Sequence, residues 1–252
     1  MLDHPSRYQL TNELHARPFP ILSSPAEAVF LALKRVEETA PVDSDADRQH
    51  LIDLLDRFGA PHPKPGATHW FGEIGKHRLK WEQHAEFVTY TLFINELSVR
   101  AFDPQSFDYF PSKWLDQAPG VRITSALVRV ETSDDTVKIH DNLRDWFVAE
   151  SLAVSGVLEG SAVIASDFRI DSAGHARFAV FTHSKCGPRR IGRVVQRLCE
   201  IETYKTMSML GLMRARDLGP SLNSLDEKLT ELMTAMTSQS ADAEQTLEEL
   251  LA

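Results

Sequence analysis

Residues 69–94, HWFGEIGKHRLKWEQHAEFVTYTLFI, decide the fold class. They contain three runs of aromatic and β-branched residues separated by short groups of turn-forming residues: His69–Ile74, Arg78–Trp81 and Phe87–Ile94. That pattern is typical of a meander of strands. Because no long helix separates these strands, the sequence favours an antiparallel sheet over a doubly wound parallel one.

Downstream segments extend the same sheet. Residues 121–131 read as a strand between Pro119-Gly120 and Ser133-Asp134. Residues 161–170 and 177–182 flank the sequence Asp-Ser-Ala-Gly at 171–174, which is a hairpin signal. Short helices are expected over residues 112–117 and 137–147. The remaining strands therefore also belong to a mostly antiparallel layer.

Two helices are predicted before the meander, after an extended, proline-rich arm over residues 1–24. Ser24-Pro25 resembles an N-cap followed by a first-turn proline, and Val29, Leu33 and Val36 recur at helical spacing before Pro41. Residues 43–58 form the second expected helix, which Gly59 ends. We expect these two helices to form a hairpin.

The C-terminal part is predicted to be helical from Pro188 to about Arg216. After Gly219-Pro220, apolar residues recur at intervals of four and three, as in a heptad seam: Leu218, Leu222, Leu225, Leu229, Leu232 and Met236. A coiled coil and an amphipathic helix packed on its own domain both produce this pattern. The predicted fold is thus α+β, with a globular domain over residues 1–216 and a helical tail over 217–252.

Composition limits the function classes. The chain has 252 residues, and 27 Lys and Arg against 36 Asp and Glu give a formal net charge of −9, which argues against general nucleic-acid binding. Two cysteines are too few for a disulfide framework and favour a reducing compartment. Without a signal-peptide pattern or an apolar run long enough to span a bilayer, we expect a cytoplasmic chain.

Four stretches together resemble a bacterial family of uncharacterised, membrane-anchored proteins that is defined only as a domain of unknown function. These stretches are NELHARPF (12–19), KWEQHAEFVTYT (80–91), DFRID (167–171) and GRVVQRLCEIETY (192–204). The resemblance covers most of the chain. It implies a globular part followed by a coiled coil and a C-terminal hydrophobic anchor, which we expect to be absent here, and it supplies no catalytic residues or cofactor.

The first candidate site lies within residues 80–86. Side chains alternate along a strand, so Glu82, His84 and Glu86 are expected to share one face with Lys80. Two carboxylates and an imidazole suit a divalent metal, a general base with its orienting partner, or a pocket for another ligand. A solvated sheet face with cross-strand ion pairs is the simpler alternative. No recognised metal-ligand spacing accompanies these residues, so no metal site is assigned.

The arm carries a similar alternation at Glu13, His15 and Arg17. If the arm folds back onto the strand that carries His84, His15 completes the same pocket. This hypothesis predicts that the two histidines lie close together.

The second candidate site is the start of the helix after Pro188. Arg189, Arg193 and Arg197 lie four residues apart, next to Arg190, and basic residues outnumber acidic ones over residues 185–216. A helix N-terminus with arginines suits phosphate, a nucleotide tail, an acidic partner segment or anionic lipid headgroups over residues 185–197. The same position predicts a lowered pKa for Cys186. A solvated basic face is again the alternative.

Several function classes lack support. The sequence has no zinc finger, helix-turn-helix pattern or aromatic platform for nucleic acid, and no P-loop, dinucleotide-binding glycine motif or serine nucleophile elbow. We therefore predict a non-enzymatic head of a membrane-anchored protein, either a ligand sensor or a scaffold, with self-association through residues 218–236. The alternative is a small-molecule or metal-binding protein or enzyme that uses Glu82, His84 and Glu86.

Overall fold

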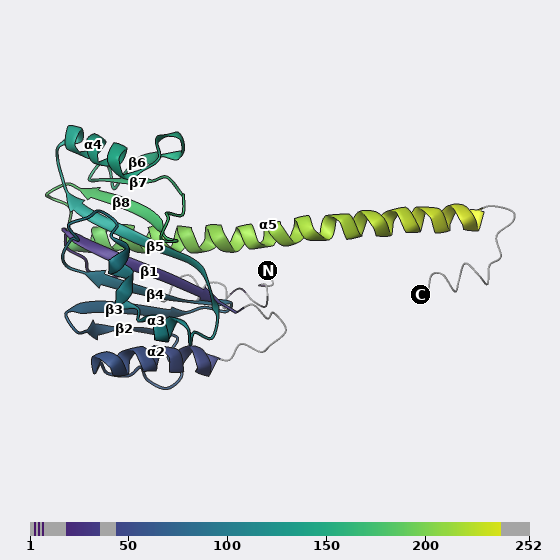
Figure 1. Cartoon of the computed structure of the whole chain (residues 1–252), viewed down its shortest axis with the longest axis horizontal. Helices are drawn as coiled ribbons and strands as arrows, with labels where there is room; N and C mark the ends of the chain where they lie inside the picture. Colours follow the sequence, from purple (N-terminus) through teal and green to yellow (C-terminus); the bar gives the residue numbers. More distant parts are fainter. Residues whose placement is uncertain (1–2, 4, 6, 8–18, 36–43, 238–252) are drawn as a thin grey trace. The chain divides into compact units, whose positions relative to one another are not determined.

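The computed structural model of the chain describes all residues except 1–2, 4, 6, 8–18, 36–43 and 238–252 (Figure 1). The chain divides into two compact units, residues 1–204 and 205–252. Among the described residues, all strands lie in the first unit and residues 205–237 of the second unit are helical, so the site described below lies wholly within the first unit.

A single eight-stranded sheet organises the first unit (Figure 1). Its strands follow the order β2-β3-β4-β1-β5-β8-β7-β6. Their bounds are β1 Ala26–Lys34, β2 His69–Ile74, β3 His77–Gln83, β4 Phe87–Ile94, β5 Val121–Thr132, β6 Ala153–Val157, β7 Ala162–Ser166 and β8 Ala176–Thr182. Neighbouring strands are antiparallel except for the parallel pair β5 and β8. The predicted α+β class with a mostly antiparallel sheet is confirmed.

The helices that cover the sheet are short. They are α2 Ser44–Phe58, the 3-10 helix η1 Pro104–Tyr109, α3 Ser112–Leu115, α4 Thr136–Trp146 and the 3-10 helix η2 Ala149–Ser151. The second predicted N-terminal helix is confirmed as α2, and the two short predicted helices are confirmed as α3 and α4. The predicted hairpin is confirmed as β7 and β8, although β7 ends at Ser166 and an isolated bridge joins Ile170 to Ala176.

The predicted N-terminal helix pair is wrong in its first member, because residues 26–34 form strand β1. This strand lies in the middle of the sheet, between β4 and β5, and every residue from Ala26 to Leu33 is buried. A strand covered on both faces carries apolar residues at consecutive positions, so the period-2 signal disappears. The spacing of Val29 and Leu33 also suits a helix, and the sequence therefore predicted a helix here.

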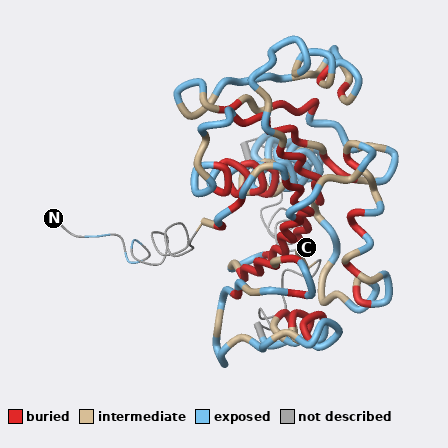
Figure 2. Tube along the Cα trace, turned by 90° about the vertical axis from the view of Figure 1, so that its left-hand side faces the viewer, coloured by how far each residue is buried: buried red, intermediate tan, exposed pale blue. Residues whose placement is uncertain are grey.

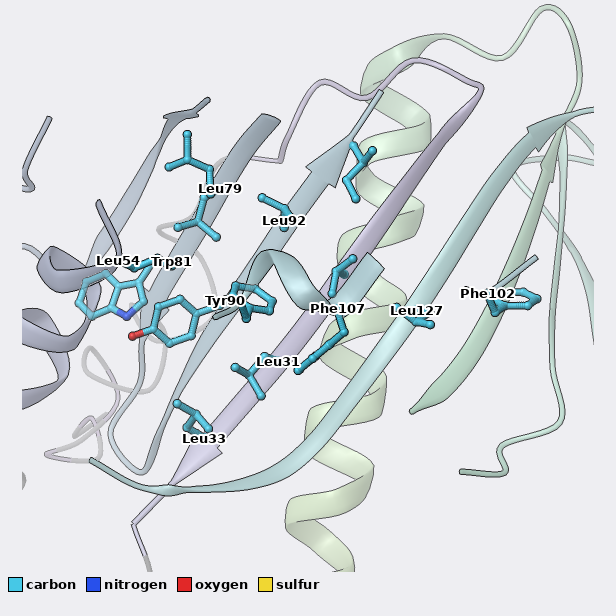
Figure 3. Packing of buried hydrophobic residues seen from close by; sticks show 14 of the residues in the cluster. Leu31, Leu33, Leu54, Leu79, Trp81, Tyr90, Leu92, Phe102, Phe107 and Leu127 are labelled. Atoms are coloured by element: carbon cyan, nitrogen blue, oxygen red, sulfur yellow. The ribbon is translucent and has the colours of Figure 1, made fainter. Parts of the chain in front are cut away.

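Each face of the sheet has its own apolar core. Buried residues concentrate in the strands of the sheet (Figure 2). On one face, leucines of α2 and aromatic residues of η1 and α3 pack against Leu79, Trp81 and Tyr90 (Figure 3). On the other, the first turns of α5 pack against β1, β5 and β8 through Ile191, Val195 and Leu198. The alternation of side chains along β3 and β4 therefore directs every second residue toward α5.

Helix α5 runs from Pro188 to Thr237 without the expected interruption near Gly219-Pro220. Pro220 lies inside the helix, where its ring nitrogen cannot donate a hydrogen bond. In the second unit, four of the seam leucines are exposed, Leu218 59%, Leu222 61%, Leu225 61% and Leu229 51%, and Leu232 is half-buried. Among the described residues, no helix combines the length and hydropathy needed to cross a membrane.

The described end of the arm lies against the start of α5. Leu22 N donates to the carbonyl of Pro188 at 3.1 Å. A Cβ atom added to Gly192 would lie 1.8 Å from the carbonyl oxygen of Pro20. Only glycine therefore permits this approach of the two backbones.

Candidate functional site

A cavity of about 330 Å³ lies between the sheet and the N-terminal part of α5. Its sheet side is formed by β1, β3, β4 and the turn after β3, and its helix side by residues 196–204. The lining residues are Phe30, Lys80, Glu82, His84, Phe87, Thr89, Thr91, Phe93, Gln196, Arg197, Cys199, Glu200, Ile201, Thr203 and Tyr204. All of them belong to the first unit.

The register of the strands sets the sheet side of the cavity. Lys80 pairs with Thr91, and Glu82 pairs with Thr89. On the other side of β4, Thr91 pairs with Phe30 of β1. Residues at paired positions of neighbouring strands point to the same face, so these five side chains form one continuous polar and aromatic surface beneath α5.

Helical spacing sets the other side. Gln196, Cys199, Glu200 and Thr203 follow one another at intervals of three, one and three residues, which places them on one face of the helix. Thr203 directs its hydroxyl to the carbonyl of Cys199 at 2.9 Å. Only the remaining side chains of this face are therefore open to polar contacts across the cavity.

A chain of hydrogen bonds and ion pairs joins sheet and helix. Lys80 Nζ lies 2.9 Å from Glu82 Oε1 and donates to Gln196 Oε1 at 2.8 Å. Gln196 Nε2 donates to Glu200 Oε1 at 2.8 Å, and Arg197 donates to Glu200 Oε2 at 2.5 Å. The side chains of Lys80 and Glu82 are only 5% and 11% exposed, so this pair is largely removed from water.

Aromatic residues form one end of the cavity. The ring of His84 stacks on Phe87 with centroids 4.2 Å apart, and Phe87 meets Tyr204 edge to face at 6.0 Å. Burial raises the pKa of the Cys199 thiol well above its ordinary range, and Glu200 adds to this effect. Cys199 is therefore held as a thiol, which is a poor nucleophile.

The structure brings together two of the three strand residues that the sequence predicted. Glu82 and His84 line the cavity beside Lys80. Glu86 does not, because β3 ends at Gln83 and the bond from His84 N to Phe87 O closes a turn that contains Glu86. Alternation ends with the strand, and the Glu86 carboxylate lies 3.5 Å from Lys34 Nζ instead.

The predicted arm residues Glu13, His15 and Arg17 lie outside the described residues. The described part of the arm approaches the cavity at Phe19. Its ring lies beneath the guanidinium groups of Arg193 and Arg197, at 4.9 and 5.6 Å. Of these two arginines, only Arg197 also lines the cavity.

The basic helix start is exposed at Arg189, Arg190, Arg193 and Arg197. Arg197 is paired with Glu200, and Arg193 stacks on Phe19. The predicted lowering of the Cys186 pKa is wrong. Burial raises this pKa, and the nearby Arg190 opposes the rise only in part.

A metal centre finds no donor set in the described part of the chain, where no group of three or more His, Cys, Asp and Glu side chains converges. At the cavity, Lys80 occupies the space beside Glu82 that a cation would need. This arrangement suits an organic ligand better than a divalent ion.

Sequence reasoning missed Phe30, Thr89, Thr91, Gln196, Cys199, Glu200 and Thr203. The two threonines had a signal, because they alternate with apolar residues in the stretch VTYTLF at 88–93. The helix residues had the spacing of a single face. Neither pattern indicates which face of the sheet the helix covers. The strand residues and the helix residues could therefore not be assigned to one site from the sequence.

Comparison with known proteins gives one match. The model of the family described as Protein of unknown function (DUF3422) matches residues 2–252. No curated protein and no solved structure matches the chain. The match spans almost the whole sequence, and the chain therefore belongs to the DUF3422 family of proteins of unknown function.

Proposed function

We propose that this protein is a non-enzymatic ligand-sensing module that binds a small molecule between its sheet and helix α5. The observation that carries the proposal is the 330 Å³ cavity, whose volume falls within the usual range of small-molecule sites. Its wall combines aromatic residues with a few convergent polar groups, which is the usual composition of such sites.

The state of the cavity's reactive groups favours binding over catalysis. Glu82 is paired with Lys80, and Glu200 with Arg197. Burial keeps Cys199 protonated. A general base needs a carboxylate or imidazole that is poised to take a proton, and a nucleophile needs an adjacent base. The ion-paired carboxylates and the neutral thiol instead support a binding role, and the imidazole of the same wall, His84, is stacked on Phe87.

Helix α5 supplies a route for the response. Residues 196–204 line the cavity, and the same helix continues to Thr237. A ligand that contacts Gln196 and Glu200 changes the free energy of ordering this part of the helix. Because the helix is continuous, the binding also shifts the conformational equilibrium of the residues that follow.

In this proposal the first unit is the cytoplasmic head of a membrane-anchored protein. Two copies associate through residues 218–236, and the exposed leucines of this seam support that step. The arginines at 189, 190 and 193 face an anionic membrane surface or an acidic partner segment, and their exposure supports it.

A binding screen on the full chain tests the core of the proposal. A mixed set of small organic acids, amides and amines is examined by ligand-observed NMR, and each hit is measured by thermal unfolding. We expect at least one compound to raise the unfolding temperature and to slow hydrogen exchange in residues 189–216.

Two substitutions at one position provide the control. Cys199→Met extends a flexible side chain into the cavity and should abolish binding, whereas Cys199→Ala enlarges the cavity and should retain it. Circular dichroism establishes that both variants are folded. If no compound binds, or if hits bind Cys199→Met as tightly as the unmodified chain, the proposal is wrong.

A further inference from the structure

Two hydroxyl groups in the cavity wall have unused hydrogen-bonding capacity. Thr89 and Thr91 are 5% and 6% exposed and line the cavity. Within the part of the chain that the structure describes, neither hydroxyl has a hydrogen-bond partner, in contrast to Thr203 on the opposite wall. Two hydroxyls that are accessible from a cavity and lack a protein partner can each bond to a polar group of a ligand, so this part of the wall is where such a group would be received.

Lys80 adds a positive charge beside these hydroxyls. Its strand position pairs with that of Thr91, and its ammonium group has three protons. Two acceptors take two of these protons, the Glu82 carboxylate at 2.9 Å and the Gln196 amide oxygen at 2.8 Å. One ammonium proton therefore remains available in the cavity wall that also carries the two threonine hydroxyls.

The acidic groups of the wall are already engaged. Glu82 faces Lys80, and Glu200 accepts from both Gln196 and Arg197. The unused groups are thus one ammonium proton and two hydroxyls, all able to donate. A carboxylate accepts from the ammonium group and from both hydroxyls at once and gains charge-assisted bonds, and the Glu82 charge beside it is already paired with Lys80. An amine can donate only to the hydroxyls and meets Lys80 as a like charge.

Around this polar group the cavity is aromatic. Phe30 lies next to Thr91 across the sheet, and Phe87 and Phe93 lie two residues beyond the threonines on β4. Resting on the ligand-binding function proposed above, we infer that the cavity takes a small aromatic monocarboxylate. Its carboxylate contacts Lys80, Thr89 and Thr91, and its ring contacts the phenylalanines.

Three matched probes test the inference on the full chain by isothermal titration calorimetry. They are 3-phenylpropanoate, 3-phenylpropanamide and 3-phenylpropylamine, which share the ring and differ in the head group. The carboxylate should bind at least about tenfold more tightly than the amide, because its hydrogen bonds are charge-assisted, and the amine should bind weakest.

Isosteric substitutions locate the head group. Thr89→Val and Thr91→Val remove hydroxyls that make no hydrogen bond to any described residue, so folding is retained while carboxylate affinity falls about tenfold. Thr230→Val is the matched control. It removes a hydroxyl that lies outside the cavity and is bonded to the carbonyl of Asp226 at 2.8 Å, so carboxylate affinity should be unchanged.

The outcomes separate this inference from the proposed function. If the amide or amine binds as tightly as the carboxylate, or if Thr89→Val and Thr91→Val have no more effect than Thr230→Val, the carboxylate assignment is overturned. The carboxylate assignment is also overturned if none of the three probes binds while other compounds bind and lose affinity in Cys199→Met. In that case the proposed binding function of the cavity still stands.

Discussion

The Nζ atom of Lys80 donates a hydrogen bond to Oε1 of Gln196 at 2.8 Å, which joins strand β3 to helix α5 across 116 residues of sequence. Both side chains are buried. A bond between buried partners restricts the position of the helix over the sheet, because breaking it leaves polar groups without water. The pair thereby links the cavity wall to the helix that we propose as the output.

Removing the ammonium group should destabilise the protein strongly. Lys80→Met leaves the Glu82 carboxylate buried without its counter-charge, and the expected loss is about 3–5 kcal/mol in the free energy of unfolding. Urea denaturation of the full chain measures this loss.

The double variant Lys80→Met with Glu82→Leu is the control. It removes both charges and should recover much of the stability lost in the single variant, because no unpaired charge remains. If the double variant is no more stable than Lys80→Met, the ion pair does not explain the loss.

Acid should destabilise the fold through His50. Its Nε2 atom lies 3.0 Å from the carbonyl of Trp114, and its Nδ1 atom lies 2.9 Å from the Tyr90 hydroxyl. Burial lowers the pKa of His50 below the ordinary value of 6.5, although the bond to Trp114 opposes this. Above pH 6.5 His50 is neutral in both the folded and the unfolded chain, so its titration does not change the free energy of unfolding there. As the pH falls below 6.5, the unfolded chain binds a proton that the folded chain resists, so stability decreases.

The measurement is the free energy of unfolding between about pH 8 and pH 5. His50→Phe should lower stability at neutral pH but make the loss of stability on acidification smaller. Some pH dependence should remain, because burial also lowers the pKa of His77 and of His175. Asn223→Ala, at an exposed position of α5 and without a titratable group, is the control and should leave the pH profile unchanged. An identical acid loss in His50→Phe would contradict the assignment.

Two glycines of α5 should respond in opposite directions to the same substitution. In Gly192→Ala the added carbon meets the Pro20 carbonyl oxygen at 1.8 Å, so we expect a loss of about 2 kcal/mol. Gly211→Ala meets nothing within 4 Å and should gain about 0.5–1 kcal/mol from helix propensity. Equal effects in thermal unfolding would show that Gly192 is not sterically required.

Charge placed on the seam should prevent self-association. Leu225 and Leu229 are largely exposed, and heptad leucines associate when a second copy covers them. In sedimentation equilibrium, the double variant Leu225→Glu with Leu229→Glu should have the monomer mass of 28.3 kDa, and the unmodified chain about twice that mass. The variant Asn223→Glu with Thr230→Glu adds the same charge off the seam and should still dimerise. A monomeric unmodified chain would contradict self-association.

The candidate site was only partly readable from the sequence. Alternation along residues 80–84 placed Lys80, Glu82 and His84 on one face, and all three line the cavity. The same rule failed for Glu86, because it applies only while the strand continues and the turn begins after Gln83. Gln196 and Glu200 could not be assigned to the site, since a helix and a strand more than 100 residues apart meet only through the fold.

Local pattern by itself determined the meander β2 to β4, helix α2 and the helical C-terminal part, because turn residues separate the aromatic and β-branched runs of the meander and apolar residues recur at helical spacing in the helices. Tertiary structure decided β1 and the cavity. Residues 26–34 are buried on both faces, so their period is lost and only pairing with β4 and β5 makes them a strand. The cavity exists because α5 covers one face of that strand, where Phe30, Thr91 and Lys80 lie side by side.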